Sequence, residues 1–263
     1  MRFFDSNSLY YGFPGTVAAS SNAAIASFPF NEEGVYPWKS LGQNIDGNSI
    51  YLERSLVQSV SINRIFIQDT NINNITIQVD LGAGYINLSS ATSFNLIKSV
   101  AGDNYFYELN NSITIFKIKI SGSNTIISNQ EKFIKQVLGF KELGRIKNND
   151  DITPTRNRIQ VVSKLNSGKS DVINKGTFFE FKIKFKAHYV ANDNGILQLL
   201  SKRDQEVWLW VNDNQEALFY MPQEPYKFGN IYKIALKGNN SPQYAKNKFY
   251  SGIDLDLTYT EVA

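Results

Sequence analysis

The chain has 263 residues, with 27 lysines and arginines against 24 aspartates and glutamates, and it contains one histidine and no cysteine. This length can bury the core of one large domain or two modest ones. The absence of cysteine excludes disulfides, thiolate catalysis and cysteine-ligated metals, and the net charge of +3 is too small to predict a nucleic-acid surface.

No stretch approaches the roughly 20 apolar residues that span a bilayer, and Met1–Asn7 lacks the apolar region of a secretory signal. We therefore expect a product that is made and folded in a cytoplasm and does not insert into membranes.

Residues 1–48 predict few regular elements. Small and polar residues fill Thr16–Ser27, and the prolines of Phe28-Pro29-Phe30 and Tyr36-Pro37-Trp38 favour extended backbone in the residues before them. We expect an arm that leads into the first domain. Because an arm with little local structure orders best against a partner, a neighbouring subunit is its expected contact.

Residues 49–150 are typical of an antiparallel β-sandwich, because strand-forming residues recur at short spacing between turns rich in Gly, Asn and Ser. The expected strands are Ile50–Ile62, Arg64–Gln68, Ile75–Val79, Tyr105–Leu109 and Ile113–Ile120. The apolar spacing changes in residues 129–140 and predicts a short helix there. The polar run 147–151, ahead of Pro154, is the expected domain linker.

Residues 151–263 predict a second β-rich (α+β) domain. In Phe179–Tyr189 every second residue is apolar, which is typical of a strand with one buried and one solvated face. The other expected strands are Arg156–Leu165, Val207–Val211, Ala217–Met221, Ile231–Leu236 and Ile253–Tyr259. Asn192-Asp193-Asn194 is expected to cap one short helix over Ile196–Lys202.

The residue types that support catalysis are scarce. His188 lies on the polar side of its expected strand with no nucleophile context around it, so a surface or interface position explains it. Asp254 and Asp256 share a strand face where two carboxylates could bind a cation, but the alternation favours a solvated face. Leu81-Gly82-Ala83-Gly84 lacks the third glycine of a dinucleotide-binding loop and favours a turn. We expect no enzyme, no cofactor and no metal site.

Two groups in the second domain are candidate protein-interface residues. Lys182, Lys184 and Lys186 form a basic stripe on one strand face, where lysines are solvated, protect a sheet edge, or contact phosphate or an acidic protein neighbour. Trp208 and Trp210 share one face of a strand whose other face is also apolar. They belong to a covered central strand, to a protein interface or to a sugar-binding surface.

Four stretches carry a family resemblance: Ala19-Ser20-Ser21, Tyr36-Pro37-Trp38-Lys39-Ser40, Arg64–Gln68 and Asp69–Ile77. With them, the segment from Ala18 to about Ile120 resembles a discoidin-type (galactose-binding-like) β-sandwich. Members of this family bind sugars, lipids or protein partners through loops at one end of the sandwich. Because the usual calcium and sugar ligands do not match this chain residue by residue, the resemblance transfers no ligand site.

Glu131-Lys132-Phe133-Ile134 and Glu142-Leu143-Gly144-Arg145, followed by Arg156–Trp210, resemble bacteriophage tail proteins that join such a sandwich to a second β-rich domain. This resemblance implies a non-enzymatic structural protein of the virion, in the distal tail, tail tip or baseplate. It further implies homo-oligomers, contacts with other tail proteins and synthesis in the host bacterial cytoplasm. The alternative is a tail module that binds carbohydrate on the host surface. Neither hypothesis includes nucleic acid.

Overall fold

The computed structural model describes residues 2–32, 34–88, 96–101, 103–145, 152–164, 170–188, 207–211, 230–236, 243–247 and 250–261. They divide into two compact units. The sandwich unit is built on Asp5–Glu142, and the C-terminal unit comprises Met1–Phe4, Leu143–Val211 and Asn230–Ala263. Antiparallel strands dominate both units, which confirms the predicted mainly β fold class with antiparallel sheets. None of the helices in the described ranges is long and apolar enough to cross a membrane.

The described residues of the sandwich unit form ten strands and two short 3-10 turns, η1 (Ala23–Ile25) and η2 (Phe28–Phe30). Its strands are β2 (Gly15–Ala19), β3 (Trp38–Lys39), β4 (Ile50–Thr70), β5 (Ile72–Asn73), β6 (Thr76–Asp80), β7 (Tyr85–Asn87), β8 (Ile97–Ala101), β9 (Asn104–Gly122), β10 (Asn124–Thr125) and β11 (Phe133–Phe140).

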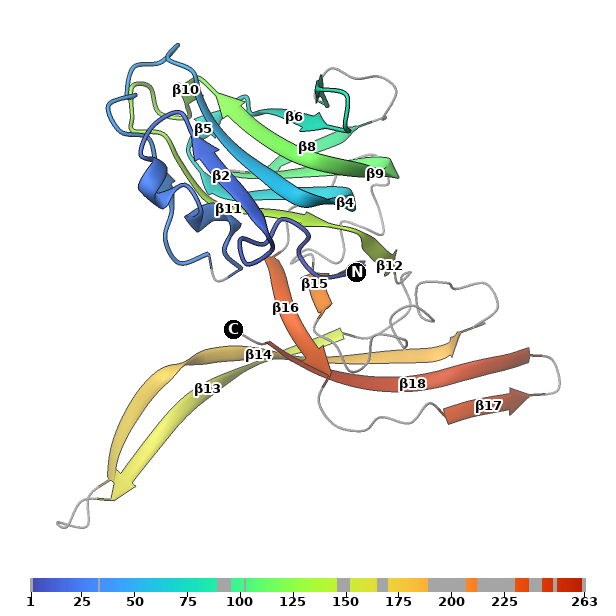
Figure 1. Cartoon of the computed structure of the whole chain (residues 1–263). Helices are drawn as coiled ribbons and strands as arrows, with labels where there is room; N and C mark the ends of the chain where they lie inside the picture. The colour runs from blue at the N-terminus through green and yellow to red at the C-terminus, as the bar shows by residue number, and fades with distance from the viewer. Residues whose placement is uncertain are drawn as a thin grey trace. The chain divides into compact units, whose positions relative to one another are not determined.

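Strands β4 and β9 pair with each other and contribute to both layers of the sandwich (Figure 1). The first half of β4 pairs with β2, while the second half of β9 pairs with β6, which pairs with β7. The second half of β4 pairs with β11, and the first half of β9 pairs with β8. Register shifts separate these halves, between Ser55 and Val60 and between Ile62 and Arg64. Such bulges bend strands, so one strand can serve two layers.

The inward faces of the two layers form one apolar core, because alternate residues of each strand are buried. Fully buried members of this core include Leu52, Ile65, Ile67, Ile77, Val79, Ile118, Ile120 and Val137. Burying each such side chain contributes about 1.5–3 kcal/mol. The buried tyrosines keep their hydroxyls bonded: Tyr105 Oη donates to the Ile72 carbonyl at 2.8 Å.

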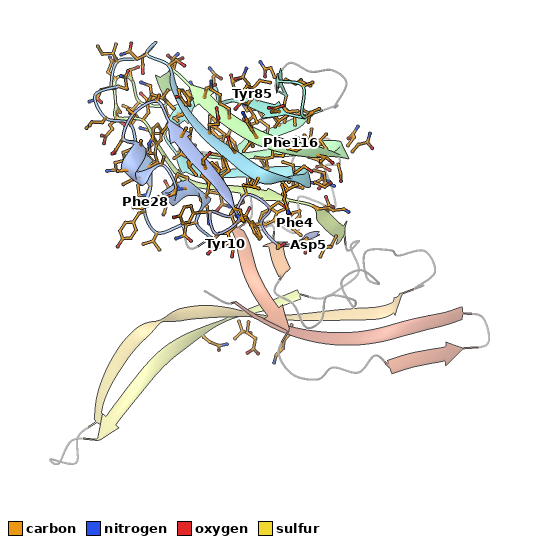
Figure 2. The ribbon with its side chains drawn as sticks, viewed as in Figure 1. Phe4, Asp5, Tyr10, Phe28, Tyr85 and Phe116 are labelled. Carbon is orange, nitrogen blue, oxygen red and sulfur yellow. The ribbon has the colours of Figure 1, made fainter. Side chains whose placement is uncertain are left out.

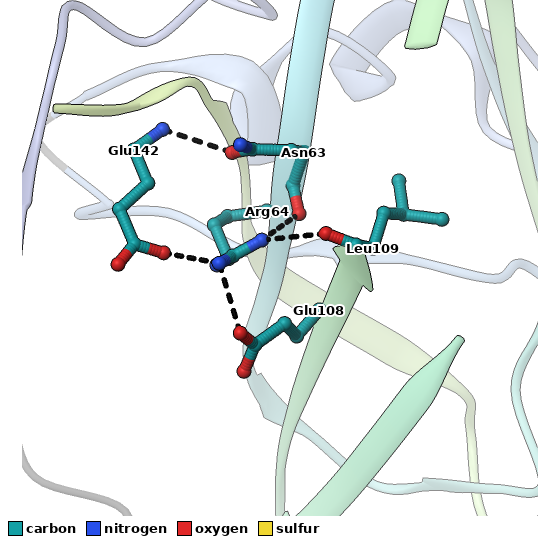
Figure 3. Close-up of polar contacts among 5 residues, drawn as sticks. All are labelled: Asn63, Arg64, Glu108, Leu109 and Glu142. Carbon is teal, nitrogen blue, oxygen red and sulfur yellow. Dashed lines mark hydrogen bonds and ion pairs between the residues drawn. The ribbon is translucent and has the colours of Figure 1, made fainter. Parts of the chain in front are cut away.

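A buried ion cluster surrounds Arg64 in the sandwich unit (Figure 3). The Arg64 guanidinium pairs with Glu108 at 2.9 Å and with Glu142. It also donates to the carbonyls of Asn63 at 2.6 Å and Leu109 at 2.9 Å. The Glu142 N–H donates to Asn63 Oδ1 at 2.8 Å, which fixes the end of the unit to the middle of β4.

The helix predicted within residues 129–140 is wrong. Phe133–Phe140 is β11, which pairs with β4 through six register pairs from Ile134 to Phe140. Its last four residues are all buried, so both faces of the strand are covered. When both faces of a strand are buried, its sequence no longer alternates between apolar and polar residues. The spacing of the apolar residues can then match that of a helix.

The C-terminal unit is one antiparallel sheet in the order β12-β1-β15-β16-β18-β14-β13, with β17 paired to β18. Its strands are β1 (Arg2–Phe4), β12 (Glu142–Arg145), β13 (Ile152–Lys164), β14 (Ser170–His188), β15 (Val207–Val211), β16 (Asn230–Leu236), β17 (Gln243–Asn247) and β18 (Tyr250–Glu261). The first strand of the chain therefore pairs inside its own chain, with Phe4 opposite Trp208. The predicted linker 147–151, helix Ile196–Lys202 and strand Ala217–Met221 lie outside the described residues.

Candidate functional site

Four exposed aromatic side chains lie on the N-terminal loops of the sandwich unit. Tyr36 is 67% exposed, Tyr11 55%, Phe13 43% and Phe28 36%. We call these four residues the aromatic loop surface. The Phe28 and Tyr36 rings contact each other, with centroids 5.9 Å apart, so part of this surface is a preformed aromatic pair. Figure 2 shows Phe28 at the lower left of this unit and Tyr10 along its lower edge.

The loop that carries Tyr11 and Phe13 is held by Arg54, which is fully buried on β4. Arg54 Nη2 donates to the carbonyls of Phe13 at 2.6 Å and Tyr10 at 3.3 Å. Arg54 Nη1 donates to the carbonyls of Thr16 at 3.3 Å and Ser55 at 3.2 Å. Burial lowers the pKa of Arg54 from its ordinary value. An arginine cannot lose its proton in a protein, so Arg54 remains a cation that is surrounded by backbone carbonyls.

Further bonds join the segments that carry the four rings. The Tyr11 N–H donates to the Phe30 carbonyl at 2.8 Å, next to the buried Pro29 of η2. Gln136 of β11 donates through Nε2 to the Glu32 carbonyl at 2.9 Å. The loops are therefore fixed to the sandwich before any ligand arrives. A preorganised aromatic surface of this kind loses little conformational entropy when it binds.

A second cluster lies on the outer face of the sheet formed by β4, β9, β6 and β7. Lys119 Nζ is 4.5 Å from the ring centroid of Tyr51 and 5.8 Å from that of Tyr85. Burial, followed by a hydrogen bond to the Glu53 carboxylate, raises the pKa of Tyr85 well above its usual range. Tyr85 lies at the upper right in Figure 2. Both rings already interact with a cation of the same chain, so this face offers a ligand less free aromatic surface than the loops do.

The neighbouring loop around residues 41–48 is organised by Lys132. This lysine is fully buried, and its Nζ donates to the carbonyls of Gln43 at 2.5 Å and Ile45 at 3.0 Å. Burial lowers the pKa of Lys132, and the Asp46 carboxylate opposes this shift. Thr125 bonds Asp46 Oδ1 through its N–H and its hydroxyl, both at 3.1 Å. The ammonium group thus satisfies two carbonyl oxygens of this loop and fixes the backbone there.

No group of three or more His, Asp or Glu side chains within the described ranges could hold a metal ion. His188 is placed opposite Ile253 on the register of β14 and β18. The register places Asp256 opposite Lys184 of β14, and Asp254 opposite Gln243 of β17.

The structure describes the backbone at the candidate interface residues predicted from the sequence. Lys182 lies between Thr153 and Thr258, so β14 is an interior strand there and does not need lysine to protect an edge. Lys186 lies on the same strand, β14. Trp208 and Trp210 are on β15, which is also interior, between β1 and β16. Their side chains, and those of Lys184 and Lys186, lie outside the described part, so their role as an interface stays a prediction.

The exposed loop aromatics were not among the predicted site residues. Trp38 is fully buried while Tyr36, two residues earlier, is exposed, although both belong to the same Tyr-Pro-Trp motif. The sequence contained one indication of this site, which is Arg54. It follows Ile50 and Leu52 at the two-residue spacing of strand positions that face the core. An arginine at an inward position requires a set of acceptors, and here those acceptors are the carbonyls of a loop.

No protein-family model and no curated protein matches this sequence. Some solved structures are similar to part of the chain. A chitosan-binding module of a chitosanase/glucanase from Paenibacillus sp. IK-5 is 18% identical, with a TM-score of 0.39, over 52% of this chain and 100% of that chain. The family 32 carbohydrate-binding module of Clostridium perfringens NanJ, solved in complex with galactose, is 15% identical, with a TM-score of 0.39, over 48% and 93%. A Bacteroides thetaiotaomicron protein assigned as an alpha-L-fucosidase is 16% identical, with a TM-score of 0.40, over 54% of this chain and 30% of that one.

Proposed function

We propose that this protein is a carbohydrate-binding module, without enzymatic activity, and that it binds sugar at the aromatic loop surface. The observation that carries the proposal is the exposure of Tyr11, Phe13, Phe28 and Tyr36 on loops that are fixed to the sandwich. Contiguous exposed apolar patches often mark interaction sites, and clustered aromatic side chains are frequent anchors of recognition.

The chemistry of the surface favours a neutral glycan. The C–H face of a pyranose is apolar, so it packs on an aromatic ring, while its hydroxyls exchange hydrogen bonds with nearby polar groups. The Phe28–Tyr36 pair supplies an apolar ring face and a phenol hydroxyl in one place. Tyr10 stands edge-on to Phe13, at 5.8 Å between centroids, and supports the second part of the surface.

Binding to a glycan array, followed by calorimetric titration with the best ligand, tests the proposal. Galactose and chitosan oligosaccharides are suitable first probes. We expect saturable binding and a loss of at least about 1 kcal/mol, or roughly fivefold in Kd, for Tyr36→Ala. Tyr85→Ala on the outer sheet face is the matched control and should bind as the wild type does. Binding that survives Tyr36→Ala and Tyr11→Ala but is lost with Tyr85→Ala would assign the sugar to the other face.

A structural role in a phage tail is the second candidate function, and it would place the chain in the virion. One observation favours it: in the C-terminal unit, the hairpin of β13 and β14 extends beyond the strands that flank it (Figure 1). Extended hairpins are suited to contacts between subunits. Electron microscopy of the purified chain distinguishes the candidates. A closed ring of defined copy number supports the tail role, whereas a single chain at all concentrations together with glycan binding opposes it.

A further inference from the structure

The aromatic loop surface consists of two parts that lie on separate segments of the chain. The first part is the pair Phe28 and Tyr36, whose rings contact each other with an interplanar angle of 46°. The second part is Tyr11 and Phe13, which belong to one turn. Figure 2 shows Phe28 at the lower left of the sandwich unit and Tyr10, the residue that begins this turn, further along the lower edge. In the described part of the chain, no ring of one part stacks on a ring of the other.

The turn that carries the second part is closed by its own backbone. The Phe13 N–H donates to the Tyr10 carbonyl at 3.1 Å, which leaves Tyr11 and Gly12 at the tip of a β-turn. The Tyr10 ring packs so closely on Gly12 that a side chain at Gly12 would collide with it. Arg54 holds the carbonyls at both ends of this turn, so the turn is fixed to β4.

The segment that carries the first part is fixed by different contacts. The Phe28 carbonyl, at the start of η2, accepts the Asn31 N–H at 3.0 Å. Trp38, two residues after Tyr36, is fully buried, and its indole N–H donates to the Ser21 carbonyl at 3.1 Å. Both residues of the pair therefore lie on anchored backbone.

One hydrogen bond sets the spacing between the two parts. The Tyr11 N–H donates to the Phe30 carbonyl at 2.8 Å, and Phe30 lies two residues after Phe28. Since a residue spans at most about 3.6 Å, the α-carbons of Phe28 and Phe30 lie within about 7 Å of each other. The two parts are thus neighbours on one surface, although their rings do not stack on each other. A pyranose is about as large as one phenyl ring and makes contact only within about 4.5 Å, so a single sugar unit stacks on one part at a time.

We propose that the aromatic loop surface binds the interior of a glycan chain, with one sugar unit on Phe28 and Tyr36 and a second unit on Tyr11 and Phe13. The inference rests on the proposed function and names its class of ligand, which is a polysaccharide of linked units. Tyr36 is 67% exposed and Tyr11 55%, so these rings protrude from the loops. A protruding surface leaves room for a chain to continue in both directions, whereas a site for a terminal sugar encloses the end of the chain.

Two linked contacts raise the affinity more than either contact alone, because the second sugar unit is held near its own rings once the first has bound. Both parts are preformed, so little of this gain is lost in ordering the loops. We expect the Kd to fall at least about tenfold between a single sugar unit and an oligosaccharide that covers both parts. Longer chains add no further contact at this surface, so the Kd of each binding site should then level off.

Calorimetric titration of the full chain with chitosan oligosaccharides from the monomer upward, and with a galactan series, tests the proposal. Phe13→Ala should reduce the affinity for the longest oligosaccharide at least about fivefold and leave the affinity for the monomer within about twofold. Tyr11→Ala, at the tip of the turn, should do the same. The matched control is Phe116→Ala on β9, because Phe116 is 39% exposed, close to the 43% of Phe13. It should bind every length as the wild type does, and thermal unfolding shows whether each variant is folded.

The number of protein copies bound per glycan chain gives a second measurement. Interior binding allows several copies on one long polysaccharide, in proportion to its length, whereas binding to a terminal sugar allows one copy at each end. Sedimentation velocity of the protein with size-fractionated chitosan and galactan measures this number. We expect it to rise with the length of the polysaccharide.

Three results would overturn the inference. They are a Kd that does not improve beyond the monomer, an unchanged affinity of Phe13→Ala and Tyr11→Ala for the longest oligosaccharide, and one copy per chain end at every length. If binding is still lost with Tyr36→Ala in these cases, the proposed function stands and only the interior mode is wrong. The absence of binding to every glycan of the array would overturn both.

Discussion

Replacement of Arg54 by methionine tests whether one buried cation holds the aromatic loop surface. Arg54→Met keeps most of the side-chain volume and removes all four hydrogen bonds to carbonyls. The Thr16 and Ser55 carbonyls belong to β2 and β4 and cannot rotate into solvent, so each loses a partner at about 1–3 kcal/mol. The Tyr10 and Phe13 carbonyls lie in a loop and can regain water. We expect a loss of about 3 kcal/mol in the free energy of unfolding.

Such a loss should lower the melting temperature of the sandwich unit by about 10 °C, since 1 kcal/mol shifts a domain of this size by roughly 2–8 °C. Circular dichroism at a single wavelength measures it. Glycan affinity should fall as well, because the loop that carries Tyr11 and Phe13 loses its anchor. Arg54→Lys should recover part of both losses, since one ammonium group offers three donors in place of five.

The matched control is Lys119→Met, which removes a cation from the outer face of the same sandwich, where it only lies over tyrosine rings. Its effect on stability should stay within about 0.5 kcal/mol. If Arg54→Met melts within 1 °C or so of the wild type, the four carbonyl contacts do not hold the loop. If it melts early but binds glycan normally, the loop does not form the sugar site.

Four other changes have defined outcomes. Burial raises the pKa of Tyr107, so the stability due to its neutral form is complete below pH 10 and is lost as the pH rises further; Tyr107→Phe should flatten this alkaline decline in denaturant titrations. Gly15→Ala would place a Cβ against the Ser55 carbonyl oxygen, whereas Gly47→Ala meets open space. In thermal unfolding, the first should therefore cost clearly more stability than the roughly 1–3 kcal/mol of backbone strain expected for the second. Arg64→Met removes the guanidinium that pairs with two buried carboxylates and should lower the free energy of unfolding by about 3–5 kcal/mol in denaturant titrations. Because Lys132 already occupies the carbonyls of its loop, a chelator should leave glycan binding unchanged in titrations with and without EDTA.

Strands with one buried face could be predicted from the sequence, since period two is visible whenever the other face is polar. In β6, Ile77 and Val79 are buried between polar neighbours, and the prediction of Ile75–Val79 as a strand agrees with it. In β11 the alternation of apolar and polar residues is absent, because the consecutive residues Leu138, Gly139 and Phe140 are all buried, and the sequence therefore did not predict a strand. Single-sequence periodicity cannot separate such a strand from a buried helix.

The exposed aromatic side chains could not be predicted in this way, because exposure depends on contacts distant in the sequence. Thr16 and Val17 are the only strong strand formers in Gly15–Ala19, yet the segment becomes β2, since Gly15 allows close approach to the Ser55 carbonyl on β4. Arg54, beside it, then fixes the residues before β2. The position of Tyr11 therefore depends on a residue more than forty positions later.

The two buried cations of the sandwich unit solve the same physical problem. A loop has few apolar residues with which to hold its backbone, and its carbonyls lose water when the loop packs on a sheet. Arg54 and Lys132 each supply several donors from one side chain, and each lies at the edge of the core. A charged donor makes stronger hydrogen bonds than a neutral one, so a single residue can fix a whole loop. The cost of burying the charge is then offset locally, and the apolar side chains of the loop remain free for a ligand.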